Sequence, residues 1–157
     1  MRKPGVRVYE TKPTTVIPVS VKHLAESVLS AENALPGGTL SVILVDHTEI
    51  KRLNARFLKR NRVTDVIAFP MGDAPDGHAS SDPCIGEVYI STDQAARQAR
   101  EYRVSMEDEL SRLVVHGILH LCGYDDGNRK RKDEMKKRED WHLARGKRVR
   151  MKRKDDR

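Results

Sequence analysis

The chain has 157 residues, enough for one domain with a substantial hydrophobic core. Apolar residues make up 38% and charged residues 34%, and the net charge of +7 comes from the C-terminal end, where residues 127–157 hold 15 Lys and Arg against 6 Asp and Glu. With two cysteines, no apolar leader segment and no apolar run of membrane-spanning length, the sequence excludes a disulfide scaffold and a membrane protein, and predicts a cytoplasmic protein.

Strand-like and helix-like patterns alternate along the chain. In order, they predict a strand at 5–10, a helix at 18–38 with Ser20 as its cap, strands at 40–46, 64–70 and 85–91, and helices at 47–60, 92–103, 105–122 and 128–145. About four strands intermixed with about five helices indicate an α/β (α+β) single domain with one mixed sheet. Residues 1–146 are predicted to form this domain.

The basic end, residues 147–157, is predicted to be a disordered tail. Basic segments attract polyanions, of which nucleic acid is the commonest. A solvated end that only improves solubility is the alternative.

The helix predicted at 105–122 is the most apolar part of the chain. Apolar residues follow helical spacing along one side of it, namely Leu110, Leu113, Val114, Gly117, Ile118 and Leu121. The opposite side is apolar as well, with Val115, Leu119 and Cys122. A helix that is apolar all round is buried. This segment is therefore predicted to be the central helix of the domain.

Two histidines interrupt this apolar helix. His116 and His120 are one turn apart and share an edge. Buried imidazoles need partners, and a shared metal ion is one, because this spacing brings both ring nitrogens toward one point. Gly123 can end the helix in the left-handed conformation, so that Asp126, or alternatively Asp125, folds back as the third ligand. Three protein ligands leave an open position for water, as in catalytic metal sites.

Other interpretations of the pair are weaker. Two core histidines hydrogen-bonded to backbone or carboxylate groups would explain the pair alone, but not the glycine turn and the acidic residues after it. Metzincin proteases have a similar spacing with Glu directly after the first His as the general base, but here that place holds Gly117. Non-haem iron oxygenases also use two His and a carboxylate, but no pattern of their β-barrel is present.

The stretch HGILHLCGYDD, residues 116–126, resembles the signature of the YbeY family of ribosomal-RNA-processing endoribonucleases, which runs His-Gly-x-Leu-His-Leu-x-Gly-Tyr-Asp-His. Three further segments resemble family motifs in the same order: LSVILVDHTEIKRLN, TDVIAFP and IGEVYISTDQAARQA. The resemblance spans about residues 16–146.

This resemblance implies a mixed α/β fold around a central helix and one zinc ion, or another divalent transition metal, held by three histidines. It implies metal-dependent cleavage of single-stranded RNA, in maturation of the small-subunit ribosomal RNA 3′ end and in ribosome quality control. The expected partners are ribosomal RNA and the small ribosomal subunit. No association with a membrane is expected, and the protein is expected to be a monomer. His116 and His120 match the first two ligands, and Asp126 stands where the family has its third histidine. A carboxylate remains a competent zinc ligand.

Two other positions depart from the family pattern. Leu58 stands where the family has an Arg expected to meet the RNA phosphate, and Lys59, Arg60 and Arg62 are candidates to bind RNA in its place. Ala68 replaces the usual Ser of the TDVIAFP segment. These departures leave a second hypothesis open, namely a catalytically weakened ribosome-assembly or RNA-binding factor that retains the metal site; a metal-dependent peptidase-like hydrolase ranks third.

Further residues are interpreted from their local context. Asp65 is a catalytic candidate, together with His116 and His120, as an outer carboxylate or proton acceptor; capping a strand is an equally good role for it. Trp141 and Leu143 are expected to anchor the last helix to the core. The remaining histidines are expected at the surface or rim: His23, His47, His78 and His142.

Overall fold

The computed structural model describes residues 5–11, 18–34, 38–58, 66–70 and 84–155. Its four strands are β1 (Gly5–Glu10), β2 (Thr39–Val45), β3 (Val66–Pro70) and β4 (Cys84–Ser91). They form one sheet in the order β1-β2-β4-β3, in which β1, β2 and β4 are parallel and β3 is antiparallel to β4. The predicted four-stranded mixed sheet is confirmed.

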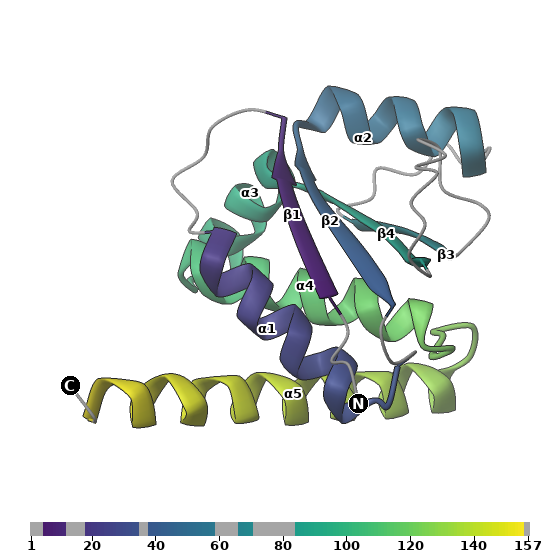
Figure 1. Ribbon diagram of the computed structural model, residues 1–157. Coiled ribbons are helices and arrows are strands. Elements are labelled where there is room, and N and C mark those ends of the chain that lie inside the picture. Colours follow the sequence, from purple (N-terminus) through teal and green to yellow (C-terminus); the bar gives the residue numbers. More distant parts are fainter. Residues whose placement is uncertain (1–4, 12–17, 35–37, 59–65, 71–83, 156–157) are drawn as a thin grey trace.

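Helices cover both faces of this sheet (Figure 1). Helix α2 (His47–Leu53), continued by a π-helical turn at Asn54–Leu58, lies on one face. Helices α1 (Pro18–Ala31) and α4 (Met106–Leu121) lie on the other, and α5 (Arg129–Asp155) packs against them from outside. Helix α3 (Thr92–Tyr102) packs against α4. No helix of the described chain is long and apolar enough to cross a membrane.

The central strands are apolar on both sides, as strands buried between two helical layers must be. Alternate residues of β2 and β4, such as Val42 and Val88, belong to the larger core shared with α1 and α4. Their neighbours, such as Ile43 and Tyr89, belong to a smaller core with Ile50 of α2. The helix carrying the two histidines thus packs on the larger core, as predicted.

Helix α1 is shorter than its sequence pattern predicts. It ends at Ala31, because Asn33 adopts a left-handed backbone conformation with φ of 53° and the amide of Ala34 bonds back to the carbonyl of Leu29. The predicted end at residue 38 and the predicted cap at Ser20 are therefore wrong. Ser20 lies inside the helix, which begins at Pro18, a residue favoured in the first turn.

Helix α5 turns a different side to the core than its sequence suggests. Over residues 129–146 its buried residues are Met135, Glu139 and His142, which recur at helical spacing. Trp141 is 42% exposed, and the guanidinium of Arg138 lies 4.2 Å from its ring centroid. Leu143 packs against the larger core, as predicted, but the prediction that Trp141 also anchors the helix is wrong. The prediction that His142 lies at the surface is wrong as well, because the rotation of the helix that buries Met135 and Glu139 also turns residue 142 inward.

A partly buried polar cluster joins α5 to the end of α1. Glu32 accepts hydrogen bonds from Arg138 Nε at 2.6 Å and His142 Nε2 at 2.7 Å, and Tyr124 Oη donates to it at 3.3 Å. Burial alone would raise the pKa of Glu32, but the bonds from His142 and Arg138 lower it. Burial lowers the pKa of His142. The cluster thus ties α5 to the end of α1 through hydrogen bonds to a single carboxylate.

The backbone of α5 is helical as far as Asp155. The sequence predicts a disordered tail over residues 147–157, yet Lys and Arg are good helix formers and no Gly or Pro follows Gly146. Where the domain ends, at residue 146 or beyond it, stays a prediction.

Candidate metal centre

Helix α4 supplies the two histidines from a firmly held position. Ser105 caps it by accepting a hydrogen bond from the amide of Asp108 at 3.0 Å, and acidic residues occupy its first turn, where they complement the helix dipole. Half of this helix is fully buried, including Val114, Val115 and Ile118. A rigid, buried helix is a good platform for ligands, because its side chains have few alternative positions.

His116 and His120 point their Nε2 atoms at one another, 3.1 Å apart. The chain turns back at Gly123, whose φ of 101° is in the left-handed range, and its amide bonds to the carbonyl of His120 at 3.1 Å. This turn brings Asp126 to the histidines, so that the three potential ligand atoms all lie within 4.8 Å of one another. The histidines are half-buried and Asp126 is exposed, so the group opens to solvent.

Asp125, the alternative third ligand, is engaged elsewhere. Its Oδ1 accepts from the amide of Gly127 at 3.0 Å, and its Oδ2 accepts from Arg131 Nη1 at 3.2 Å. These bonds hold the turn before α5. They favour Asp126 as the ligand and give Asp125 a role in shaping the loop.

A fourth residue of the centre, Glu139, is missed by the sequence patterns. Its Oε1 accepts a hydrogen bond from His116 Nδ1 across a sequence separation of 23 residues. Glu139 is 7% exposed although it lies in a strongly charged helix. No ligand-like spacing links it to the histidines, so only the packing of α5 on α4 discloses it.

The donor set fits a divalent transition metal. Bonds of 2.0–2.1 Å to a tetrahedral zinc ion place neighbouring ligand atoms about 3.3 Å apart, close to the 3.1 Å between His116 Nε2 and His120 Nε2. Because Nδ1 of His116 bonds to Glu139, the free electron pair of that ring is on Nε2, where a metal would need it. Burial lowers the pKa of His120 and so favours its neutral, metal-binding form.

Cys122, close to this group in sequence, is not part of it. The side chain is half-buried and packs against the larger core, as predicted from its place on the helical wheel. Burial raises the pKa of its thiol to about 11. It therefore stays protonated near neutral pH.

Gly117 has no room for a side chain. A Cβ atom there would lie 2.6 Å from Val88 Cγ1 and 3.0 Å from Val66 Cγ2, so this position faces the sheet and not His116. The glycine lets α4 approach β3 and β4 closely. The general-base Glu of metzincin proteases therefore has no counterpart at this position.

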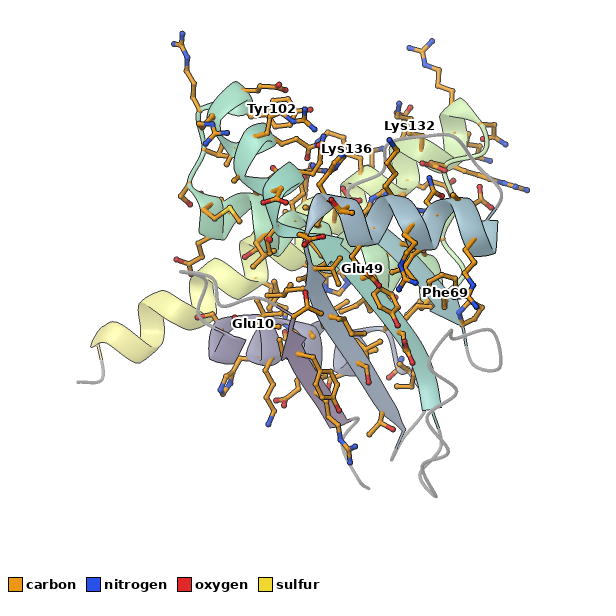
Figure 2. All side chains as sticks on the ribbon, turned by 90° about the horizontal axis from the view of Figure 1, so that it is seen from above. Glu10, Glu49, Phe69, Tyr102, Lys132 and Lys136 are labelled. Atoms are coloured by element: carbon orange, nitrogen blue, oxygen red, sulfur yellow. The ribbon has the colours of Figure 1, made fainter. Side chains whose placement is uncertain are left out.

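One side of α5 carries positive charge on the turns before Glu139, the residue that contacts His116. Lys132 and Lys136 precede Glu139 by seven and three residues and so lie on the same side of α5. Both are exposed, and Figure 2 shows their side chains near one another. Lys136 is 3.8 Å from Asp140, an exposed pair that holds it weakly.

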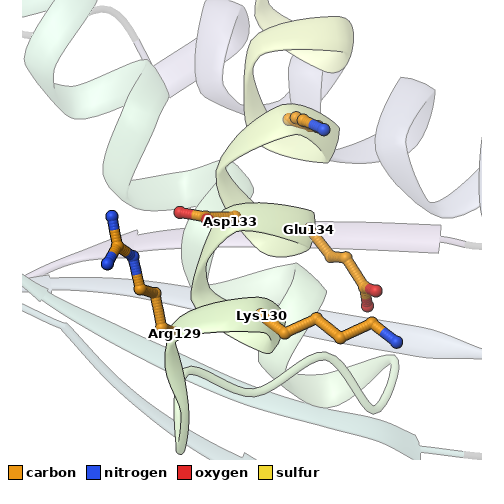
Figure 3. Close-up of a pocket in the computed structure, with 5 residues that line it drawn as sticks. Arg129, Lys130, Asp133 and Glu134 are labelled. Atoms are coloured by element: carbon orange, nitrogen blue, oxygen red, sulfur yellow. The ribbon is translucent and has the colours of Figure 1, made fainter.

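The opposite side of α5 carries an open hollow (Figure 3). Charged residues of both signs line it, namely Arg129, Lys130, Asp133, Glu134 and Lys137. Lys130 and Lys137 are turned about 160–180° from Glu139 around the helix. This hollow includes none of the three candidate ligands.

Several predicted site residues lie outside the described part of the chain. They are Asp65 and the RNA-binding candidates Lys59, Arg60 and Arg62. The backbone of Leu58 closes the π-helical turn, but its side chain is also outside the described residues. Ala68 is half-buried in β3 opposite Val88 and packs against the larger core.

Comparison with known proteins identifies the relatives of this chain. The family model described as Endoribonuclease YbeY matches residues 9–147. An Endoribonuclease YbeY of Salinibacter ruber is 39% identical over 79% of this chain and 80% of its own length, and one of Aquifex aeolicus is 46% identical over 67% of each. The solution structure of a Thermotoga maritima protein superposes with a TM-score of 0.61 at 29% identity, covering 90% of this chain and 88% of that one. With its fold, its His-Gly-x-Leu-His helix and its relatives in agreement, the chain belongs to the YbeY family.

Proposed function

We propose that this protein is a metal-dependent endoribonuclease that cleaves single-stranded ribosomal RNA, acting at the 3′ end of the small-subunit RNA and in ribosome quality control. The observation that carries the proposal is the convergence of His116, His120 and Asp126 at an open surface. The names of the curated relatives supply the substrate class. Zinc is the metal that this donor set suits best. We place the protein in the cytoplasm, with the small ribosomal subunit, and as a monomer.

The chemistry divides between the ion and the chain. His116, His120 and Asp126 would hold a divalent ion, which would supply Lewis acidity toward a phosphoryl oxygen and lower the pKa of a water molecule. Glu139 accepts a hydrogen bond from His116 and orients its ring, and Lys132 and Lys136 of α5 bind neighbouring phosphates of the RNA. Asp65, Lys59, Arg60 and Arg62 stay candidates, the first as a proton acceptor and the others as contacts to the RNA backbone.

The proposal is tested with purified protein and a labelled single-stranded RNA. Wild type is expected to carry about one zinc per chain and to cleave the RNA in a chelator-sensitive way, while a duplex of the same sequence resists. His116→Ala/His120→Ala is expected to lose both metal and cleavage. His23→Ala, an exposed histidine on α1, is the matched control and should retain both.

The same preparations separate the alternatives. If wild type binds metal and RNA but cleaves no faster than the double variant, the enzyme proposal is wrong and the assembly-factor hypothesis, motivated by Leu58 and Ala68, replaces it. Absence of metal from wild type prepared without chelators would contradict the ligand assignment. Peptidase activity lost in the double variant would revive the third hypothesis, against which the position of Gly117 argues.

A further inference from the structure

We propose that Glu139 is a positioning residue for the metal ligand His116, and that metal binding and the packing of α5 therefore stabilise each other. The inference rests on the proposed metal site. It assigns a role to a carboxylate on the last helix, outside the sequence motif that holds the three ligands.

The burial of Glu139 requires an explanation. An ionised carboxylate is costly to bury unless it is paired. Glu32 is paired with Arg138, and Glu109 is paired with Arg112. In the described part of the chain, Glu139 instead pairs with His116.

The contact controls both the protonation and the direction of His116. A carboxylate that accepts from Nδ1–H keeps the proton on that nitrogen and leaves the lone pair on Nε2. The same bond fixes the ring, so that Nε2 stays 3.1 Å from its counterpart on His120. Without the carboxylate, the ring can rotate and take the other tautomer, and a metal ion would have to offset the cost of ordering it.

The contact also links the centre to the attachment of α5. Among residues 129–146 of this helix, two of the three buried side chains, Glu139 and His142, are polar and depend on partners outside α5. A divalent ion at His116 adds positive charge behind the ring that Glu139 contacts. The bond between α5 and α4 is therefore stronger with the metal bound, and by linkage an undocked α5 weakens metal binding.

The test compares Glu139→Gln with Glu109→Gln, a variant at a second buried carboxylate, on α4, that is paired with Arg112. Zinc affinity is measured by competition with a chromophoric chelator, and the site is observed by the visible absorption of bound Co²⁺. Glu139→Gln is expected to weaken zinc binding about 10–100-fold and to alter the Co²⁺ spectrum. Glu109→Gln should leave both unchanged, and zinc should stabilise it against urea as much as it does wild type.

A second measurement does not depend on the variants. NMR of the histidine rings in zinc-loaded wild type is expected to show His116 with its proton on Nδ1. A proton on Nε2, or a folded Glu139→Gln with wild-type zinc affinity, would overturn the inference. If wild type itself binds no zinc, the proposed function fails, which is a different result from a variant that binds as well as wild type.

Discussion

Replacing Gly117 by Ala adds one methyl group at the closest approach between α4 and the sheet. The new Cβ would lie 2.6 Å from Val88 Cγ1, well inside van der Waals contact. Val88 is fully buried in the middle of β4 and, being β-branched, has little rotamer freedom, so the backbone of α4 has to move outward.

Two effects of opposite sign set the size of the change. Overpacking a well-packed core costs about 1–3 kcal/mol. Replacing Gly by Ala inside a helix returns about 0.5–1 kcal/mol. We expect Gly117→Ala to lower the free energy of unfolding by about 1–2 kcal/mol. Zinc affinity should fall with it, because the helix that moves carries His116.

Urea unfolding of a double-mutant cycle with Val88→Ala tests this reasoning. Val88→Ala alone removes two buried methyl groups and should cost about 2–3 kcal/mol. In the double variant the methyl group added at position 117 enters the space that Val88 leaves, so the combined loss should be smaller than the sum by at least about 1 kcal/mol. Strictly additive losses, or a Gly117→Ala protein more stable than wild type, would refute the packing argument.

Two further predictions concern pH and RNA. Burial holds the folded pKa of His142 below its unfolded value near 6.5. The unfolded chain therefore takes up the proton first, and the free energy of unfolding falls as the pH drops below about 6.5. Urea titrations at pH 7 and 5 should show a smaller fall for His142→Gln than for wild type, and equal falls would contradict this role of His142. Lys132→Ala/Lys136→Ala should weaken single-stranded RNA binding and reduce the slope of log affinity against log salt concentration by about 0.7 for each lost phosphate contact. Lys130→Ala/Lys137→Ala makes the same change of charge on the opposite side of α5 and should have less effect. Equal losses of affinity in fluorescence-anisotropy titrations would show that only net charge matters.

The sequence predicts those parts of the centre that are local. His116 and His120 share one helix, so their spacing is enough to place them together, and a glycine turn of fixed length brings Asp126 to them. Glu139 and His142 could not be predicted in the same way, because their burial depends on how α5 rotates against α4 and α1. That rotation is set by packing between helices and leaves little trace in a helix that is charged nearly throughout.

The same limit explains the wrong end of α1 and the wrong anchor on α5. The apolar spacing of α1 continues past Ala31, but Asn33 in a left-handed conformation ends the helix, and asparagine tolerates that conformation without demanding it. Trp141 is the largest apolar residue of the last helix and therefore the natural candidate for an anchor. Its partner is the guanidinium of Arg138, which shields one face of the indole while leaving the residue exposed.

The position of Glu139 on the final helix has a consequence for the order in which the protein matures. Translation produces the histidine pair before the carboxylate that orients it, which follows His116 by 23 residues. A nascent chain that ends short of α5 thus has the three proposed metal ligands but lacks the carboxylate that contacts His116. On the proposed function, the centre is therefore complete only after α5 has been synthesised and has docked on α4.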